Sequence, residues 1–206
     1  MAHDQLLRQV ADLRAENERL RELSLIDPLT GLHNYRYFQE QLEIEMERVR
    51  RTGAPCGLIM LDLDHFKLVN DNYGHEAGNT VLQEAAAVIK AGTRAMDIVC
   101  RYGGEEFAII LPSTTLEEGE RIVERIRRAL KRRKILYRET PIRVTISAGA
   151  ACLRYLDPLT QVQFIELADA ALYQAKHAGR DQVCSRLPEN ALPTEVGPAE
   201  KELLKK

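Results

Sequence analysis

The chain has 206 residues, of which 45% are hydrophobic and 29% charged, which excludes a wholly disordered protein and leaves room for one large or two very small domains. Its 29 basic and 31 acidic residues give a net charge of -2, which excludes a protein that coats nucleic acid or membranes through charge alone. Four cysteines without a CxxC pair argue against a zinc site or a disulfide framework and indicate reduced thiols in the cytoplasm. No apolar run approaches the roughly 20 residues of a membrane helix, so we expect neither a membrane segment nor a nucleic-acid partner.

The first segment, residues 4–24, is rich in Leu, Arg and Glu. Leu6, Leu13 and Leu20 recur every seven residues, and Val10 and Asn17 occupy the alternate seam positions. This pattern is typical of a parallel two-stranded coiled coil, in which one buried Asn fixes the register. A single amphipathic helix lying on its own domain is the alternative. We therefore expect residues 1–25 to form a coiled-coil stalk that joins two copies of the chain into a homodimer.

From residue 26 to about 186, helical and extended patterns alternate. The expected helices cover 34–51, 77–91, 116–134 and 161–178, and the expected strands cover 57–63, 98–102, 107–112, 142–153 and 181–185. Gly103-Gly104-Glu105-Glu106 joins two of these strands, which predicts a β-hairpin with a Gly-Gly turn. The tail from Leu187 contains three prolines and ends in charged residues. We therefore expect one domain over 26–186, followed by a mostly disordered tail over 187–206.

Two pairs of carboxylates stand out in this domain. Asp62 and Asp64 lie at the end of the apolar strand, and Glu105 and Glu106 occupy the Gly-Gly turn. If these strands are neighbours, the two pairs face each other at one sheet edge and make a site for a hard cation such as Mg²⁺, completed by a polyphosphate. Acidic turns are often merely solvated, which is the alternative. Because side chains alternate along a strand, Asp64 points away from Asp62 and is expected to brace the following loop.

At these residues the sequence resembles a known family. Arg101-Tyr102-Gly103-Gly104-Glu105-Glu106-Phe107 is similar to the signature of the GGDEF diguanylate cyclases, in the variant with Glu at the third position. Further segments resemble the family's other motifs in the same order: DPLTGLHN (27–34), DLDHFK (62–67), NDNYGH (70–75), VTISAG (144–149) and ADAALYQAK (168–176). The resemblance implies an α/β (α+β) fold, with a central, mostly antiparallel five-stranded sheet wrapped by helices, like the palm of nucleotidyl cyclases and polymerases. It also implies an enzyme that condenses two GTP into cyclic di-GMP.

The resemblance assigns the metal ligands to the two acidic pairs. It implies that Asp62, Glu105 and Glu106 are catalytic and hold two Mg²⁺ (or Mn²⁺) ions per active site, helped by the carbonyl of Leu63. Gly103 and Gly104 carry no side chains, so a large substrate can approach the backbone of the turn closely.

The phosphate-binding residues implied by the resemblance lie in two places. The backbone N–H groups of His65 and Phe66, together with Lys67, are similar to the family's cradle for the terminal phosphates. Lys176 and Arg180 lie four residues apart, so on one helix they share a face, and in the family such a pair grips the γ-phosphate. A solvated helix end is the alternative interpretation of this pair.

The base-reading residues depart from the family pattern. Asn70 matches the family's guanine-reading Asn, but Asn79 follows Gly78 where the family usually has Asp. A carboxylate accepts from both donors of guanine, whereas an amide offers one acceptor and one donor. A lost buried hydrogen bond costs roughly 1–3 kcal/mol, or about one to two decades of guanine preference. Leu29 and Leu82 match apolar positions that flank the base, although isolated leucines would ordinarily be core residues.

Arg94 and Asp97 form an RxxD motif that is separated by five residues from Gly103 of the Gly-Gly turn, as in the family's product-inhibition site. A surface ion pair is the alternative. Arg125 matches a further arginine that helps to bind the inhibitory cyclic di-GMP in the family. Arginine suits this role since guanidinium groups stack on guanine and bind phosphates bidentately. Tyr35 stands where the family usually has Arg, and the sequence offers no account of its effect.

Together these features favour a product-inhibited diguanylate cyclase that binds GTP, releases two pyrophosphate and is active as a dimer. Two alternatives stay open. One is an enzyme of relaxed specificity that forms cyclic GMP-AMP or mixed cyclic dinucleotides because of Asn79. The other is a catalytically inactive receptor that binds cyclic di-GMP through Arg94 and Asp97, which the intact carboxylates and lysines of the site count against.

Overall fold

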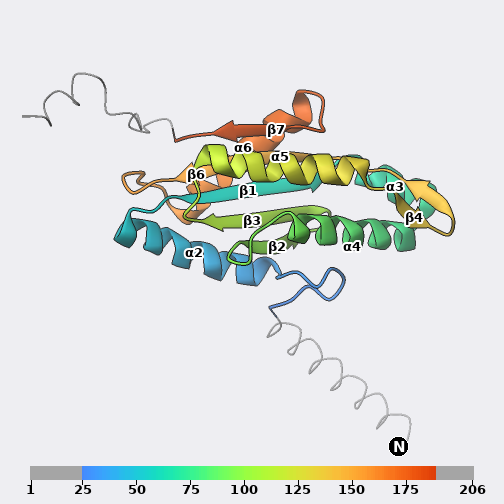
Figure 1. The fold of residues 1–206 in the computed structure, drawn as a ribbon, viewed down its shortest axis with the longest axis horizontal. Coiled ribbons are helices and arrows are strands. Elements are labelled where there is room, and N and C mark those ends of the chain that lie inside the picture. The colour runs from blue at the N-terminus through green and yellow to red at the C-terminus, as the bar shows by residue number, and fades with distance from the viewer. Residues whose placement is uncertain (1–24, 189–206) are drawn as a thin grey trace, which may run out of the picture.

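The computed structural model describes residues 25–188, which form a sheet with helices on both faces (Figure 1). The segment 4–24 with its predicted coiled coil, and the predicted tail beyond residue 188, lie outside the described residues, so both stay predictions. Among the helices of the described part, none combines the length and apolar character needed to cross a membrane.

The five-stranded sheet has the order β2-β3-β1-β6-β7, and its neighbours are antiparallel except for the parallel pair β6 and β7. The strands are β1 (Cys56–Leu63), β2 (Ile98–Gly103), β3 (Glu106–Pro112), β6 (Ile146–Leu153) and β7 (Val183–Arg186). All of β1, the central strand, is buried. A strand buried on both faces reads as a continuous apolar run, which is why this segment could be recognised from the sequence. The predicted mostly antiparallel five-stranded sheet is confirmed.

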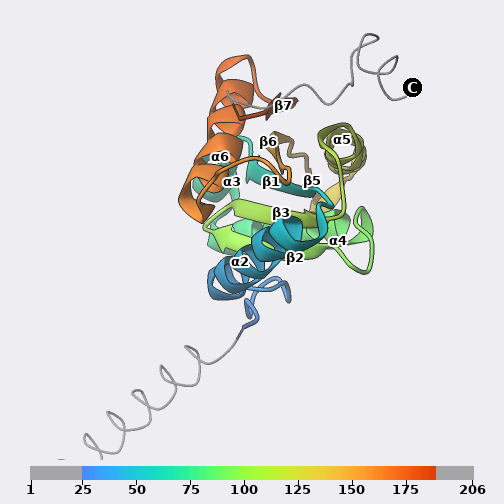
Figure 2. The same ribbon diagram turned by 90° about the vertical axis from the view of Figure 1, so that its left-hand side faces the viewer.

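The helices are α2 (Tyr35–Thr52), α3 (Phe66–Tyr73), α4 (His75–Ala91), α5 (Leu116–Arg132) and α6 (Gln161–His177). α2 and α6 cover one face of the sheet, and α4 and α5 cover the other (Figure 2). Each face of the sheet has its own hydrophobic core. Leu58 and Met60 of β1 belong to the core under α2 and α6, whereas Ile59 and Leu61 belong to the core under α4 and α5. Alternate residues of β1 therefore pack on opposite sides, and a register slip would expose none of them to water but would mismatch both cores.

α3 is a helix that the sequence did not predict. Only Phe66 and Val69 of it are buried, too few for a recognisable amphipathic repeat. It packs closely on α4 because Gly78 has no side chain: a Cβ there would lie 1.9 Å from Oδ1 of Asn70. This close approach positions the loop between β1 and α3, which precedes the helix.

The strand predicted over 142–153 begins only at Ile146. Its partner β1 ends at Leu63, opposite Ile146, and beyond that pair only the N–H group of Asp64 bonds this segment, at the carbonyl of Thr145 2.9 Å away. The residues before it form a separate two-stranded hairpin of β4 (Ile135–Tyr137) and β5 (Thr140–Ile142).

α6 lies directly on β6 at Gly149. A Cβ at that position would lie 2.1 Å from the carbonyl oxygen of Ala168 and 2.2 Å from the backbone nitrogen of Leu172, so only glycine permits this contact. A capping box at Thr160 begins the helix. The close contact holds the last turn of α6, which carries Lys176, at a set distance from the sheet.

Candidate active site

The carboxylates of β1 and of the β2–β3 hairpin meet at one edge of the sheet. Asp62 on β1 lies opposite Glu106 on β3 in the antiparallel register. The N–H group of Leu63 donates to the carbonyl of Glu105 at 3.3 Å, which ties the hairpin turn to the end of β1. One carboxylate from each predicted acidic pair, Asp62 and Glu106, therefore lies at this edge.

Asp62 is buried and Glu106 is half-buried, and both carboxylates resist ionisation. The carboxylate of Asp62 pairs with Nζ of Lys176 at 2.7 Å. Burial nevertheless raises the pKa of Asp62, with a contribution from Asp64, while Lys176 and Arg180 oppose the rise. Burial, together with the charge of Asp62, likewise raises the pKa of Glu106. Two such carboxylates at close range fit a divalent cation, whose charge would favour the ionised form of both.

The protein supplies only part of a metal coordination sphere. Within residues 25–188, no three His, Cys, Asp or Glu side chains converge into a complete metal site. The donors at the carboxylate edge are all oxygens, which suit Mg²⁺ or Mn²⁺ better than metals that prefer nitrogen or sulfur. An incomplete set of protein ligands is usual for Mg²⁺ that binds together with substrate phosphates.

Arg101 holds the turn of the hairpin in place. Its guanidinium donates to the carbonyl of Gly104 at 3.0 and 2.8 Å. It also reaches both carboxylate oxygens of Asp27, at 3.2 and 3.1 Å. The space above the turn is open, since a Cβ on Gly104 would meet no atom within 4 Å. Arg101 thus fixes the turn on one side, and the side toward which a Cβ of Gly104 would point is open.

The loop between β1 and α3 presents backbone donors. His65 has a φ of 57° and begins α3 without a side-chain cap. In the described part of the chain, the N–H groups of His65 and Phe66 have no hydrogen-bond acceptor, and Lys67 next to them is exposed. Unpaired N–H groups at the start of a helix favour the binding of phosphate. The predicted phosphate cradle therefore has a suitable conformation.

Asp64 is bonded on all sides. Its carboxylate accepts hydrogen bonds from Oγ1 of Thr145 at 2.7 Å, from Oγ of Ser147 at 2.6 Å and from the N–H group of Asp181 at 3.0 Å. The prediction that Asp64 braces the loop is confirmed.

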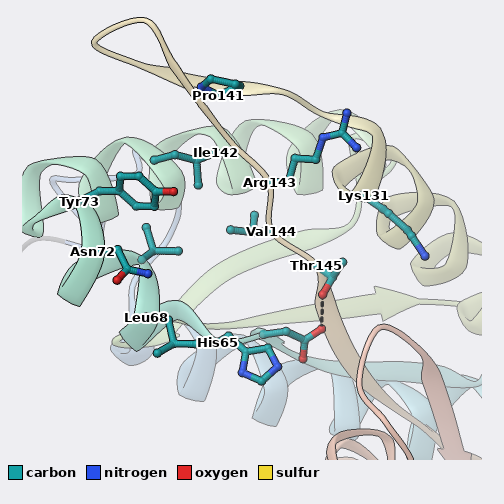
Figure 3. Close-up of a pocket in the computed structure, with 12 residues that line it drawn as sticks. His65, Leu68, Asn72, Tyr73, Lys131, Pro141, Ile142, Arg143, Val144 and Thr145 are labelled. Carbon is teal, nitrogen blue, oxygen red and sulfur yellow. Dashed lines mark hydrogen bonds between the residues drawn. The ribbon is translucent and has the colours of Figure 1, made fainter.

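A cavity of about 430 Å³ lies beside α3 (Figure 3). Leu68 and Tyr73 of α3 line one side of it, and Lys131 and Arg143 line the other. Its lining shares only His65 with the residues predicted to bind substrate. The predicted GTP site is therefore the carboxylate edge and the adjoining loop, and this cavity lies outside it.

The prediction that Lys176 and Arg180 share one helix face is wrong. α6 ends at His177, and the chain leaves the helical conformation at Gly179, whose φ is 114°. Arg180 lies in the following turn with a φ of 62°. Both cations still favour the ionised form of Asp62 by lowering its pKa. They therefore flank the carboxylate edge, one from a helix end and the other from a turn.

The predicted base-reading residues gather where α3 and α4 meet. Asn70 lies against Gly78, and Asn79 is the next residue of α4. The carbonyl of Leu29 accepts a hydrogen bond from a glutamine of α4 at 3.2 Å, so the first described loop closes against the same helix. Asn79 is exposed, whereas Leu82 is only 3% exposed and offers a ligand little surface.

The residues of the predicted inhibitory site also lie together. Oδ2 of Asp97 accepts from the N–H group of Arg94 at 2.6 Å, and its buried Oδ1 has no partner among residues 25–188. Arg125 of α5 reaches the same loop by donating to the carbonyl of Gly92 at 2.7 Å. The side chain of Arg94 is exposed, so the motif offers its guanidinium to a ligand, whereas Asp97 fixes the backbone of the loop from a buried position.

Two further features of the site were not predicted. Burial and the charge of Asp62 contribute most to the raised pKa of Glu106, and the charge of Asp169 on α6 raises it further. Asp169 precedes Lys176 by two helical turns, and this spacing could have placed it on the same face. Tyr35 meets Tyr102 edge-on with ring centroids 5.0 Å apart, so it supports the residue before the Gly-Gly turn. Burial raises the pKa of Tyr102 to about 12.

Comparison with known sequences identifies close relatives. The model of the family "Diguanylate cyclase, GGDEF domain" matches residues 24–182. The diguanylate cyclase DgcP of Pseudomonas aeruginosa is 42% identical over 166 residues, which are 81% of this chain and 24% of DgcP. The response regulator PleD of Caulobacter vibrioides is 38% identical over 176 residues, which are 84% of this chain and 38% of PleD. The chain thus spans less than half the length of both relatives.

Solved structures show the same likeness in three dimensions. Diguanylate cyclase SiaD, in complex with its activator SiaC from Pseudomonas aeruginosa, is 38% identical with a TM-score of 0.76, covering 89% of this chain and 74% of that one. The coiled coil and GGDEF domain of DgcB from Caulobacter crescentus, in complex with c-di-GMP, is 33% identical with a TM-score of 0.75, covering 88% of this chain and 99% of that one. Because sequence and fold agree over the same residues, the chain belongs to the GGDEF family of diguanylate cyclases.

Proposed function

We propose that this domain condenses two GTP molecules into cyclic di-GMP and releases two pyrophosphate. The observation that carries the proposal is the opposed pair of Asp62 and Glu106, whose pKa values are both raised. The pair lies beside Lys176 and under an open turn. Such a site attracts a cation together with the polyphosphate that completes its coordination.

The reaction forms two phosphodiester bonds. In each, the 3′ oxygen of one GTP attacks the α-phosphorus of the other, the bond to pyrophosphate breaks, and the hydroxyl proton is lost to solvent. The N–H groups of His65 and Phe66 and the ammonium of Lys67 would bind the terminal phosphates and stabilise the charge on the departing pyrophosphate. Arg180 would hold the γ-phosphate.

Asp62, Glu105 and Glu106, with the carbonyl of Leu63, would hold two Mg²⁺ (or Mn²⁺) ions. When bound, such ions polarise the α-phosphate and lower the pKa of the attacking hydroxyl. The protein keeps these oxygens on paired strands and on the turn between two of them, so the backbone that carries them is already in place before substrate binds. Lys176, which now neutralises Asp62, would become available to the phosphates once a metal takes over that carboxylate.

A single assay tests the activity and the base specificity together. The protein is incubated with equal GTP and ATP and with Mg²⁺, and the products are identified by mass. We expect cyclic di-GMP as the main product with two pyrophosphate for each molecule formed. No pyrophosphate at any protein concentration would contradict the proposal and favour the inactive receptor.

Relaxed base specificity is a second candidate, carried by Asn79. Asn79 is exposed on α4, directly after Gly78, against which Asn70 packs, and an amide can offer a donor where a carboxylate only accepts. Cyclic GMP-AMP in the mixed pool would support it. Asn79→Asp should then raise guanine preference by about one to two decades, the worth of one buried hydrogen bond. Strict guanine selectivity in both proteins would rule this candidate out.

Each domain would bind one GTP, so catalysis needs two domains facing each other across their hairpins. The predicted coiled coil over residues 1–25 would supply the dimer by raising the effective concentration of the second domain. A protein without residues 1–24 should then cyclise GTP slowly at low concentration and recover as protein is added. A specific activity independent of concentration would contradict this role.

Product inhibition is proposed at Arg94, Asp97 and Arg125. The unpaired Oδ1 of Asp97 supports it, because a buried oxygen without a donor costs about 1–3 kcal/mol that a ligand can recover. Arg94→Ala should leave the initial rate unchanged and weaken inhibition by added cyclic di-GMP. Equal inhibition of both proteins would show that the motif match is accidental.

A further inference from the structure

The turn that carries Arg180 has an unusual backbone. Gly179, Arg180 and Asp181 have φ values of 114°, 62° and 45° in succession. The left-handed conformation costs most residues with a Cβ roughly 1–2 kcal/mol, and Asp less. Outside a two-residue hairpin turn, such a conformation at Arg180 is stabilised by contacts with its surroundings. The structure must therefore contain an anchor for this turn.

That anchor is Asp181, whose polar groups are all bonded. Its Oδ1 accepts from Nη1 of Arg127 at 2.5 Å, and its Oδ2 accepts from Nζ of Lys131 at 2.6 Å. Its carbonyl accepts from Arg127 at 2.9 Å, and its N–H group donates to Asp64 at 3.0 Å. Burial opposes ionisation, yet the two cations of α5 hold the pKa of Asp181 below its ordinary value.

The same residue connects to the phosphate loop. Asp64, which accepts its N–H group, also binds Thr145 and directly precedes His65 (Figure 3). Lys131, which holds the carboxylate of Asp181, lines the same cavity as Thr145. Three elements are therefore joined at one residue, Asp181: α5, the loop before α3, and the turn that presents Arg180.

We propose that Asp181 is a positioning residue, which holds Arg180 in the left-handed conformation that directs its guanidinium to the terminal phosphate of GTP. The inference rests on the proposed function, since that function assigns the γ-phosphate to Arg180. It assigns a role to Arg127 and Lys131 as well, because their contacts to Asp181 fix the turn from α5. The expected effect is specific: the anchor should matter for the γ-phosphate and not for the rest of the nucleotide.

The test measures binding of 3′-deoxy-GTP and 3′-deoxy-GDP, which lack the attacking hydroxyl, to the full chain with Mg²⁺. Asp181→Ala and Arg180→Ala should each weaken triphosphate binding about tenfold, the worth of one charge-assisted hydrogen bond, and change diphosphate binding less than about twofold. The double variant should bind the triphosphate no more weakly than either single variant, because both changes remove the same contact. Asp157→Ala is the matched control, since Asp157 closes another loop by accepting from Arg154 and should leave both affinities unchanged.

Several outcomes would overturn the proposal. Equal weakening of both nucleotides by Asp181→Ala would show a merely structural role, and unchanged binding of both would show no role. If Arg180→Ala does not discriminate the two nucleotides, the γ-phosphate assignment falls and this inference with it. If the two variants lose triphosphate binding selectively but the wild type makes no cyclic di-GMP, only the proposed function is contradicted. If Asp181→Ala does not fold, two other variants test the proposal. Arg127→Met should selectively weaken triphosphate binding in the same way. Asp181→Asn should weaken it in part, since Asn also tolerates a positive φ but lacks the charge that binds Arg127 and Lys131.

Discussion

Asp62 and Asp64 lie two residues apart at the end of β1, yet their surroundings are opposite. Asp64 accepts three hydrogen bonds from groups on β6, on the segment before it and on the turn after α6. Asp62 forms one ion pair, with Lys176, and lies opposite Glu106 on the neighbouring strand β3. Burial raises the pKa of Asp62 in spite of the nearby cations. A saturated carboxylate stabilises the fold, whereas one with unmet charge is a place where a ligand can bind. The comparison thus separates structural from chemical roles within one strand.

Asp62→Asn is the strongest test of the chemical role. Turnover should fall by at least about 10³-fold, because several kcal/mol of charge stabilisation are lost with the metal ligand. The free energy of unfolding at pH 7 should change by less than about 1 kcal/mol, since an ionised Asp62 is disfavoured by burial in the folded protein. Steady-state kinetics and urea unfolding measure the two quantities. Near-normal turnover in this variant would remove Asp62 from the metal site.

Asp64→Ala should show the reverse pattern. It leaves the hydroxyls of Thr145 and Ser147 and the N–H group of Asp181 without their acceptor, which should lower the free energy of unfolding by roughly 3 kcal/mol. Urea unfolding monitored by circular dichroism gives the value. The comparison would fail if Asp64→Ala were as stable as the wild type while Asp62→Asn were strongly destabilised.

Glu106→Gln should produce the smallest effect, visible in the pH dependence of stability. Burial and Asp62 raise the pKa of Glu106 above its ordinary value of 4.5. Between the unfolded and the folded pKa the folded state binds more protons, so wild-type stability falls as pH rises through that range. Without divalent ions, the variant should therefore have a slightly higher melting temperature than the wild type at pH 7, and the difference should vanish at about pH 4. Calorimetry at both pH values tests this, and a lower melting temperature of the variant at pH 7 would contradict it.

The sequence predicted what depends on apolar patterning and on short motifs. β1, the hairpin strands and the long helices follow from apolar runs and repeats, and the meeting of Asp62 with the hairpin follows from the motif order. α3 escaped because its two buried residues give no periodic signal. The shared face of Lys176 and Arg180 failed because spacing alone does not reveal that the backbone turns left-handed at Gly179. Asp181 escaped for a related reason: its partners on α5 lie about fifty positions away, and such contacts appear only when the chain is folded.

The contact at Gly149 has a consequence for regulation. Side chains can absorb a displacement by changing rotamer, but two backbones in van der Waals contact cannot, so α6 and the sheet move as one rigid body. We therefore do not expect a regulatory signal to act by tilting α6, with its Lys176, relative to the strands of the same domain. In the proposed dimer, control would instead act on the relative orientation of the two domains and not on the internal structure of either one.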